Sequence, residues 1–295
     1  MNNFTIKKSQ RFNTEFFARI LFTLAASAAI IAVGLLCVFL FMQGLPFMFG
    51  YGPLRFLSGT NWRPSWDPPV FGILPMIVGS LYVTAGAIIL GVPVGIFAAV
   101  FMAKFCPKPI YVFLKPAINL LAGIPSVVYG YFGMVILVPF VRNNFGGTGN
   151  SILTASILLG MMILPTIITI SEHSIRAVPQ EIYDGAIALG ASHEYATFKA
   201  VFPAAKSGIF ASVILGIGRA VGETMAVRMV AGNQAVLRMP NEILSGVRTL
   251  TANVVIELGY AADDHRNALI ATGVVLFVFI MIINALFSLL KKKEG

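Results

Sequence analysis

Six stretches of this chain are apolar for about 20 residues or more, and their length constrains the fold more than any other feature. They cover roughly 20–42, 72–103, 113–141, 152–171, 207–230 and 267–290. A helix of about 20 apolar residues crosses the hydrocarbon core of a bilayer. Charged residues are only 11% of the chain, about half of their share in a soluble domain. We therefore predict an all-α polytopic membrane protein with six transmembrane helices.

The basic residues orient the chain across the membrane. Twelve lysines and arginines lie on the side of the N-terminus and six on the opposite side, counted over 1–19, 104–112, 172–206 and 291–295 against 43–71, 142–151 and 231–266. Cytoplasmic loops are enriched in Lys and Arg, so both termini are predicted to be cytoplasmic. The first apolar run is too long for a cleaved signal peptide and is expected to remain as the first helix.

We expect four parts along the chain. They are an N-terminal cytoplasmic tail with the first helix at 1–50, an extracytoplasmic segment at 51–71, a transmembrane domain at 72–290 with a cytoplasmic loop at 172–206, and a cytoplasmic tail at 291–295.

The sequence has no pattern typical of metal, nucleotide or nucleic-acid binding. His173, His193 and His265 are scattered, without the spacing of metal ligands, and we interpret them as solvated or interfacial. There is no P-loop, and no basic stretch combines with aromatic residues on a soluble face. Cys37 and Cys106 are placed in a span and in a cytoplasmic loop, so no disulfide is expected. We therefore expect a chain that binds no cofactor itself and is not an enzyme.

A polar, helix-forming segment separates the fourth and fifth apolar runs. Residues 181–189 favour a helix, Gly190 follows where that helix is expected to end, and 193–201 favour a second short helix that stops at Pro203. A helix–Gly–helix hairpin that protrudes from a membrane protein and exposes small residues such as Ala188 is suited to docking on another protein.

The third apolar run contains a proline flanked by small residues. Pro125 frees a backbone carbonyl inside the run, and the neighbouring Ser126 hydroxyl can satisfy it locally. Amides or hydroxyls exposed at such a break could face an anion that passes through the membrane. A simple proline kink is an equally well supported alternative.

The fifth apolar run contains two charged residues, Arg219 and Glu223, which we place well inside a helix. A charge near the middle of a bilayer costs at least about 2.5 kcal/mol, and such residues are commonly functional. Their spacing of four positions predicts that both lie on one face. The alternative is a structural pair that neutralises itself. Gly218 and Gly222 are interpreted as positions that let a neighbouring helix approach closely.

Five short motifs together resemble the permease subunits of phosphate ABC importers: Gly123–Gly130 (GIPSVVYG), Met162–Thr166 (MILPT), Arg176–Pro179 (RAVP), Ala188–Ala191 (ALGA) and Gly218–Ala226 (GRAVGETMA). The external stretches 55–64 and 71–75 resemble the PstC type rather than the PstA type. The resemblance covers about residues 50–290, and the Gly-Glu-Thr-Met motif at 222–225 is its phosphate-specific part. Asp184 and Gly185 depart from the pattern, where Glu-Ala or Ala-Ala is usual.

The resemblance implies a type I ABC importer permease of the MetI-like fold, in the bacterial cytoplasmic (inner) membrane, which imports inorganic phosphate by alternating access. The implied partners are a second permease subunit of the PstA type, an ATPase dimer of the PstB type that holds ATP and Mg, and a phosphate-binding protein of the PstS type. The expected ATPase-coupling residues are Glu181, Asp184, Gly185, Ala188, Leu189, Gly190 and Ala191. The expected substrate-path residues are Arg219, Glu223, Ser126 and Thr224.

Other functions stay open at this point. One is a permease for another oxyanion, sulfate or molybdate. Another is a secondary transporter or membrane receptor whose hairpin contacts a regulator; inverted repeats would favour the transporter, and no convincing repeat relates the two halves. The nearly neutral segment 231–266 either docks the binding protein or connects two helices.

Overall fold

A computed structural model describes the backbone of residues 4–293 and the side chains of residues 15–285. Its elements in chain order are α1 (Phe4–Tyr51), α2 (Pro53–Ser58), β1 (Trp62–Arg63), β2 (Val70–Phe71), α3 (Leu74–Val100), η1 (Phe101–Phe105), α4 (Lys108–Gly123), α5 (Ser126–Phe132), η2 (Gly133–Leu137), α6 (Val138–Phe145), α7 (Ile152–Arg176), α8 (Gln180–Ala188), α9 (His193–Ala196), η3 (Thr197–Val201), α10 (Phe202–Ala204), α11 (Lys206–Gly222), α12 (Met225–Val230), α13 (Leu250–Glu257) and α14 (Asp263–Lys293). Three short elements, η1 to η3, are π-helical turns. The basic side chains expected in the tails at 1–14 and 286–295 lie outside the described side chains.

The predicted six spans are found when one bent pair of helices counts as a single span. Five helices are long and apolar enough to cross a membrane: 15–51, 74–105, 126–145, 152–176 and 263–285. The sixth candidate, which stands fifth along the chain, is the pair 193–204 and 206–222, bent by 69° at Ala205. Residues 206–222 correspond to the predicted fifth span, and 193–204 belong to the polar hairpin that precedes it. The first part of the pair extends beyond the predicted stop at Pro203, because that proline stands in the first turn of α10, where proline is tolerated.

α3 and α7 form the centre of the bundle. Glycines on α3 bring the two helices close together: a Cβ on Gly91 would lie 2.8 Å from the carbonyl oxygen of Gly160, and one on Gly86 would collide with Ser156. Leu158, another α7 residue, is fully buried. Small residues at helix contacts are typical of membrane bundles, where close packing rather than the hydrophobic effect holds helices together.

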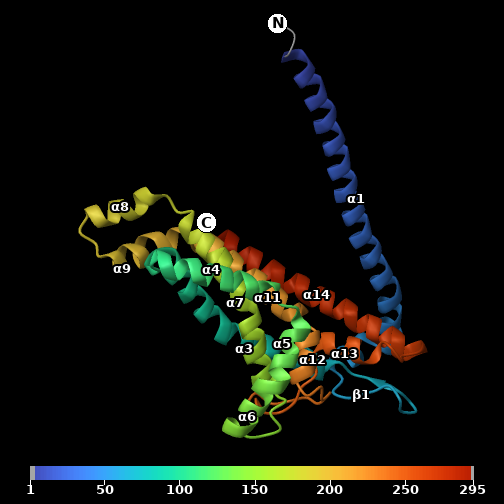
Figure 1. Ribbon diagram of the computed structural model, residues 1–295. Coiled ribbons are helices and arrows are strands. Elements are labelled where there is room, and N and C mark those ends of the chain that lie inside the picture. The colour runs from blue at the N-terminus through green and yellow to red at the C-terminus, as the bar shows by residue number, and fades with distance from the viewer. Residues whose placement is uncertain (1–3, 294–295) are drawn as a thin grey trace.

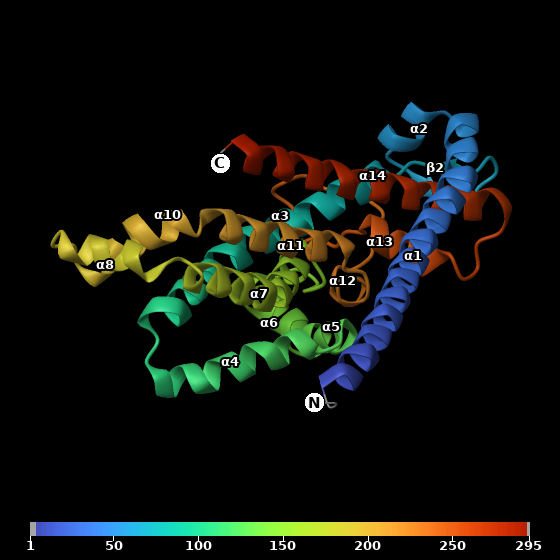
Figure 2. The same cartoon turned by 90° about the horizontal axis from the view of Figure 1, so that it is seen from above.

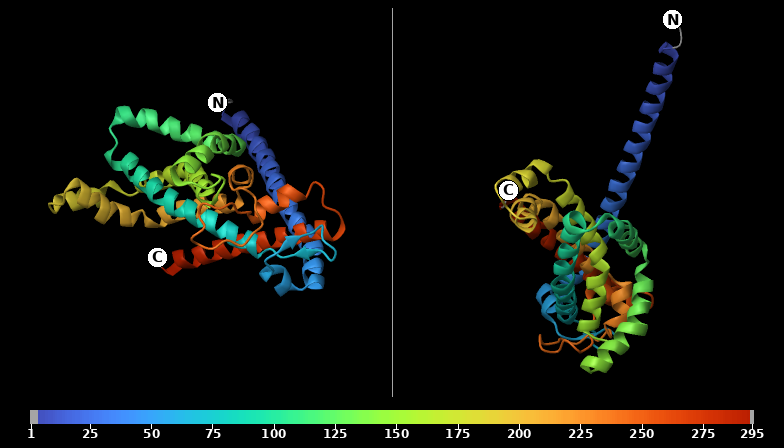
Figure 3. Two further views of the ribbon diagram at one scale, coloured as in Figure 1. Left: turned by 90° about the horizontal axis from the view of Figure 1, so that it is seen from below. Right: turned by 60° about the vertical axis from the view of Figure 1, so that its left-hand side comes forward.

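The remaining helices surround this centre, and different elements lie at the two ends of the bundle. α14 and α4 lie at opposite edges, with α3, α7 and α11 between them (Figures 2 and 3). The segment 180–204, which we call the α8–α9 hairpin, lies at the left of Figure 1 near the C-terminal end of α14, and α1 rises to its N-terminal end at the top, whereas β1 and α6 lie toward the bottom. This arrangement agrees with the predicted topology, in which both termini and the loop 172–206 are cytoplasmic.

The first helix, α1, is much longer than the predicted span and is packed only near its C-terminal end. It meets α14 near its C-terminal end, where the rings of Phe41 and Phe277 are 5.7 Å apart, and diverges from the other helices toward its N-terminal end (Figures 1 and 3). None of its most apolar window within 15–51 is buried in this chain.

The extracytoplasmic side is held together by a buried carboxylate, Glu257. Its Oε2 accepts from Trp62 Nε1 at 2.8 Å and lies 2.8 Å from His265 Nε2, while its Oε1 accepts from Arg248 Nη1 at 2.5 Å. Trp62 belongs to the short antiparallel pair of β1 and β2. The segment 231–266 therefore carries an internal tether, and the expectation that His265 is simply solvated or interfacial is wrong.

Candidate functional site

The α8–α9 hairpin has the helix–Gly–helix form that its sequence predicts. α8 ends at Ala188, and Gly190 follows with φ = +86°, a left-handed conformation that glycine adopts without strain. The Ala191 N–H donates to the Ala186 carbonyl oxygen at 3.1 Å, which closes the helix end. The Ser192 side chain then caps the start of α9.

The tip of the hairpin is exposed. No residue of α8 is buried, and Leu189 is 91% exposed. Beside it lies an open pocket of about 480 Å³, lined by Ala186, Leu189, Gly190, Ala191, Ser192 and Tyr195. The other residues expected to couple to an ATPase, namely Glu181, Asp184, Gly185 and Ala188, are also exposed. The hairpin therefore presents the expected residues on one protruding segment.

His193 fastens the base of the hairpin to the end of the second span. Its Nε2 lies 3.2 Å from the Lys104 carbonyl oxygen, and its Nδ1 lies 2.7 Å from the Tyr183 hydroxyl. A carbonyl oxygen only accepts, so Nε2 donates to Lys104 O, while the Tyr183 hydroxyl can donate to or accept from Nδ1. The Phe105 ring stands edge-on to the imidazole, with centroids 4.6 Å apart. The His193 side chain is thus a link between α8, α9 and η1 rather than a solvated histidine.

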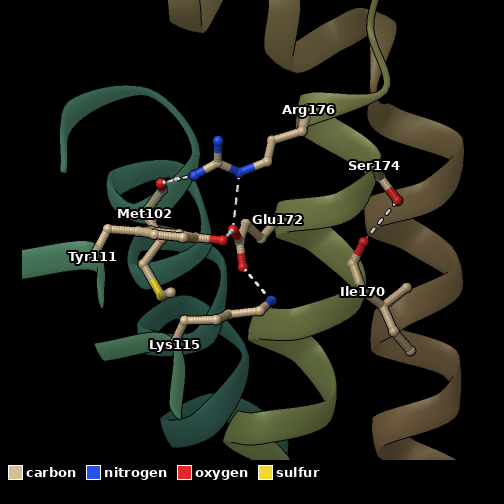
Figure 4. Close-up of polar contacts among 7 residues, drawn as sticks. All are labelled: Met102, Tyr111, Lys115, Ile170, Glu172, Ser174 and Arg176. Carbon is tan, nitrogen blue, oxygen red and sulfur yellow. Dashed lines mark hydrogen bonds and ion pairs between the residues drawn. The ribbon is translucent and has the colours of Figure 1, made fainter. Parts of the chain in front are cut away.

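A buried carboxylate, Glu172, joins three elements just before the hairpin (Figure 4). Its Oε1 accepts from the Tyr111 hydroxyl at 2.7 Å and from Arg176 Nε at 2.9 Å, and its Oε2 accepts from Lys115 Nζ at 2.7 Å. The Glu172 side chain is only 1% exposed. Arg176 Nη2 also donates to the Met102 carbonyl oxygen at 2.7 Å. We call Tyr111, Lys115, Glu172 and Arg176 the Glu172 cluster.

The Glu172 cluster connects α4, the end of α7 and η1. The Arg176 guanidinium lies 4.6 Å over the Tyr111 ring. The hydrogen bond to the Glu172 carboxylate raises the pKa of the Tyr111 hydroxyl, because only the protonated phenol can donate to an anion. Sequence reasoning missed this cluster, since Lys115 and Tyr111 are 57 and 61 residues from Glu172. The only local signal was the spacing of Glu172 and Arg176.

The third span is broken at Ile124 and Pro125 rather than kinked. Both residues are extended, with ψ of 127° and 141°. Pro125 has no N–H to donate to Leu121 four residues earlier, and the Tyr129 hydroxyl donates to that carbonyl oxygen at 2.9 Å instead. The prediction that Ser126 satisfies the freed carbonyl is therefore wrong. The Ser126 hydroxyl has no hydrogen-bond partner within the described part of the chain.

The fifth span is broken as well, at Glu223 and Thr224. Glu223 is extended, with ψ of 126°. Its Oε1 accepts from the Ala226 N–H at 3.2 Å, and its backbone oxygen accepts from Thr251 Oγ1 at 3.3 Å. The Glu223 carboxylate therefore caps the start of α12, and Thr224 Oγ1 donates back to Gly222 O at 3.2 Å.

The predicted pairing of Arg219 with Glu223 on one helix face is wrong. The helix ends between the two residues, and no ion pair joins them within the described residues. Arg219 Nη1 instead lies 3.5 Å from Thr166 Oγ1 on α7. The interpretation of Gly218 and Gly222 as packing positions also fails within this chain, because a Cβ on either would meet nothing within 4 Å.

The two breaks belong to neighbouring helices. A Cβ on Gly130 of α5 would lie 2.9 Å from the Cα of Ala226 and 2.6 Å from Met229 Sδ on α12. The predicted topology has both spans run outward from the cytoplasm, so the starts of α5 and α12 lie at the same end of this pair. Ser126 stands at one start and Thr224 directly precedes the other.

Comparisons with known proteins identify the family of the chain. Residues 91–294 match the family described as binding-protein-dependent transport system inner membrane component. The probable ABC transporter permease protein YqgH of Bacillus subtilis (strain 168) is 38% identical, with 92% of this chain and 90% of that protein covered. The phosphate transport system permease protein PstC of Mesorhizobium japonicum is 32% identical, with coverages of 89% and 85%.

Among solved structures, a chain of the MetNI methionine ABC transporter in inward facing conformations superimposes with a TM-score of 0.61 at 17% identity, over 76% of this chain and 96% of that one. The fold is therefore the predicted MetI-like permease fold. With most of its length matched, this chain belongs to the family of inner membrane components of binding-protein-dependent transport systems.

Proposed function

We propose that this chain is the permease subunit of an ABC importer that moves inorganic phosphate into the cytoplasm by alternating access. The observation that carries the proposal is the similarity of 89% of the chain to a phosphate permease of the PstC type. The site supports it chemically, since Arg219 supplies a guanidinium close to the break in the fifth span. An oxyanion that leaves water needs such charged donors to offset its desolvation.

We place the substrate path along the two broken spans. The breaks fall inside the predicted apolar runs 113–141 and 207–230, next to the helices 126–145 and 206–222. Irregular backbone within the membrane is tolerated where it is buried in protein or lines a water-filled route. Arg219 offers the anion two parallel donors, and the hydroxyls of Ser126 and Thr224 stand at the starts of the following helices. Glu223 has a positioning role in this proposal, because its carboxylate holds the start of α12.

We place the ATPase contact at the α8–α9 hairpin. An ATPase dimer of the PstB type, which binds ATP and Mg, would cover Leu189 and the neighbouring pocket. Movement of the hairpin then reaches the bundle by two routes: through His193 to η1, and through the Glu172 cluster to α4 and α7. The first route is a direct hydrogen bond, and the second follows the chain from Arg176, the last residue of α7, into the hairpin, so the hairpin and the cytoplasmic ends of the spans move together.

We propose that a second permease subunit, of the PstA type, covers two surfaces that this chain leaves open. One is α1, whose apolar window has no buried residue. The other is the face of α11 with Gly218 and Gly222, where a helix from another subunit can approach closely. A binding protein of the PstS type would deliver phosphate from the extracytoplasmic side.

Import of another oxyanion is the second candidate function. The relative with the higher identity, 38%, is described only as a probable ABC transporter permease, with no substrate named. The Arg219 guanidinium would serve sulfate or molybdate as well as phosphate, so the charge of the site alone does not choose among them.

Reconstitution of the whole importer tests the proposal. The chain is co-expressed with its second permease, ATPase and binding protein, purified as a complex and placed in liposomes. We expect ATP-dependent uptake of radiolabelled phosphate that a hundredfold excess of sulfate or molybdate reduces by less than about half. Uptake that sulfate or molybdate suppresses fully would favour the second candidate, and a chain that purifies without a P-loop ATPase would refute both.

A further inference from the structure

The outer part of the fifth span carries a cation that no residue in the described part of the chain neutralises. The Arg228 side chain, on α12, has no hydrogen bond, ion pair or aromatic contact within the described part of the chain. Its backbone is fixed, since the Arg228 carbonyl oxygen accepts from Asn233 Nδ2 at 2.7 Å. No ion pair joins Arg228 to Glu223 among the described residues, and Glu223 Oε1 accepts from the Ala226 N–H.

The packing of α12 shows which way Arg228 faces. Ala226, Val227 and Val230 are buried against this chain's own core. Met225 stands three positions before Arg228, on the same side of the helix, and is 40% exposed. Arg228 therefore lies on the side of α12 that points away from the core of its own chain.

Beyond that side lies either lipid or the space that this chain shares with a second permease. A guanidinium without a counter-charge is unfavourable against lipid tails, and ionisable residues in spans commonly face a water-filled cavity or the bundle interior. If Arg228 instead faced lipid, the phosphate group of a lipid headgroup near the outer surface could be its counter-charge. α12, however, packs against α5 and α7, which carry one break of the proposed path and Thr166, the partner of Arg219.

We propose that Arg228 is a second anion-binding residue of the translocation route, placed on the extracytoplasmic side of the break and reached by phosphate before Arg219. The inference rests on the proposed function for the identity of the anion. Arg228 offers two parallel N–H donors to phosphate oxygens. A second cation along a low-dielectric route also raises the local concentration of anions, and the absence of a carboxylate partner leaves its donors free.

The test removes the positive charge of Arg228 by substitution with cysteine and then restores it by chemical modification of the thiol. Cys37 and Cys106 are the only cysteines of the chain, and both are replaced by serine. Arg228→Cys is introduced into the reconstituted importer in this background. The thiol is then treated from outside with a cationic aminoethyl or an anionic sulfonatoethyl methanethiosulfonate reagent. Arg142→Cys is the matched control, because Arg142 is an exposed arginine at the extracytoplasmic end of α6.

We expect Arg228→Cys to lower phosphate uptake at least about tenfold, the equivalent of one charge-assisted hydrogen bond, with the complex still assembled. The aminoethyl reagent should restore uptake to within about threefold of the parent, and the sulfonatoethyl reagent should not. Arg142→Cys should react with both reagents without loss of uptake.

Three results would overturn the proposal. Unchanged uptake in Arg228→Cys would mean that the guanidinium lies at lipid phosphate or in solvent. A thiol that does not react would mean that the residue lies away from any aqueous route. A complex that fails to assemble would mean that Arg228 is bonded to the second permease. The parent complex tests the proposed function separately. If the parent imports another oxyanion, the Arg228 comparison is repeated with that anion.

Discussion

Glu172→Gln should loosen the link between the hairpin and the bundle while keeping the shape of the side chain. The amide retains one oxygen for Tyr111 and Arg176, but its NH₂ group replaces the oxygen that Lys115 Nζ contacts at 2.7 Å. Lys115 is 19% exposed and would face a donor instead of an acceptor. Arg176 is 43% exposed and keeps its bond to the Met102 carbonyl oxygen, so Lys115 bears most of the loss.

The structure sets the size of this effect. Removal of one partner from a buried ion pair costs about 3–5 kcal/mol, because the other charge stays buried. We expect about 3 kcal/mol, since Lys115 keeps some contact with solvent. Removal of both charges in Glu172→Met with Lys115→Met should recover most of that loss, because an apolar pair of similar volume replaces a buried ion pair at little cost.

The assay measures two quantities on the purified complex. The first is the midpoint temperature of thermal unfolding, and the second is the number of ATP molecules hydrolysed per phosphate transported. Glu172→Gln should lower the first and raise the second, and the double methionine variant should restore the first only. Glu242→Gln is the control, because its carboxylate is 40% exposed and stands 3.8 Å from Arg238, and an ion pair open to solvent contributes little. The reasoning is refuted if Glu172→Gln behaves like this control.

Three further predictions concern the hairpin, the path and pH. Gly190→Leu should uncouple ATP hydrolysis from transport without blocking insertion, whereas Gly190→Asn, which tolerates a left-handed backbone, should lose less; normal phosphate-stimulated hydrolysis in the leucine variant would contradict this. Arg219→Gln should abolish uptake at normal complex levels, Arg219→Lys should restore part of it, and the Arg219→Gln/Glu223→Gln double variant should stay inactive; recovered uptake in the double variant would show a purely structural pair. Because the folded-state pKa of Tyr111 is raised above 10, its hydrogen bond contributes fully below that pH and is lost as the pH rises through the raised value; unfolding midpoints between pH 8 and 11 should therefore fall less steeply in Tyr111→Phe.

The features that sequence reasoning found are those with a local cause. Gly190 ends a helix because its left-handed φ suits glycine, and the pattern before it is enough to predict the hairpin. Pro125 interrupts its span because proline lacks an N–H, and this cause is visible in the sequence itself. The number of spans follows from apolar length alone.

The features that it missed depend on residues distant in the chain. No proline marks the break at Glu223; the extended backbone there is held by the hydroxyl of Thr251, 28 positions later, and by its own side chain. Charge spacing alone suggested a pair of Arg219 and Glu223, since spacing assumes that the helix continues. The Glu172 cluster needs α4 beside α7, and no local pattern specifies that contact.

The divergence of α1 bears on how the importer is made. In water, an apolar helix left without a neighbour would drive aggregation, but lipid tails solvate it about as well as another helix does. This chain can therefore enter the membrane and form its α3–α7 centre before any other subunit is synthesised. If a second permease covers α1, as we propose, recognition depends on the fit of side chains along α1 rather than on hydrophobicity, and a mismatched subunit would be rejected by shape within the bilayer.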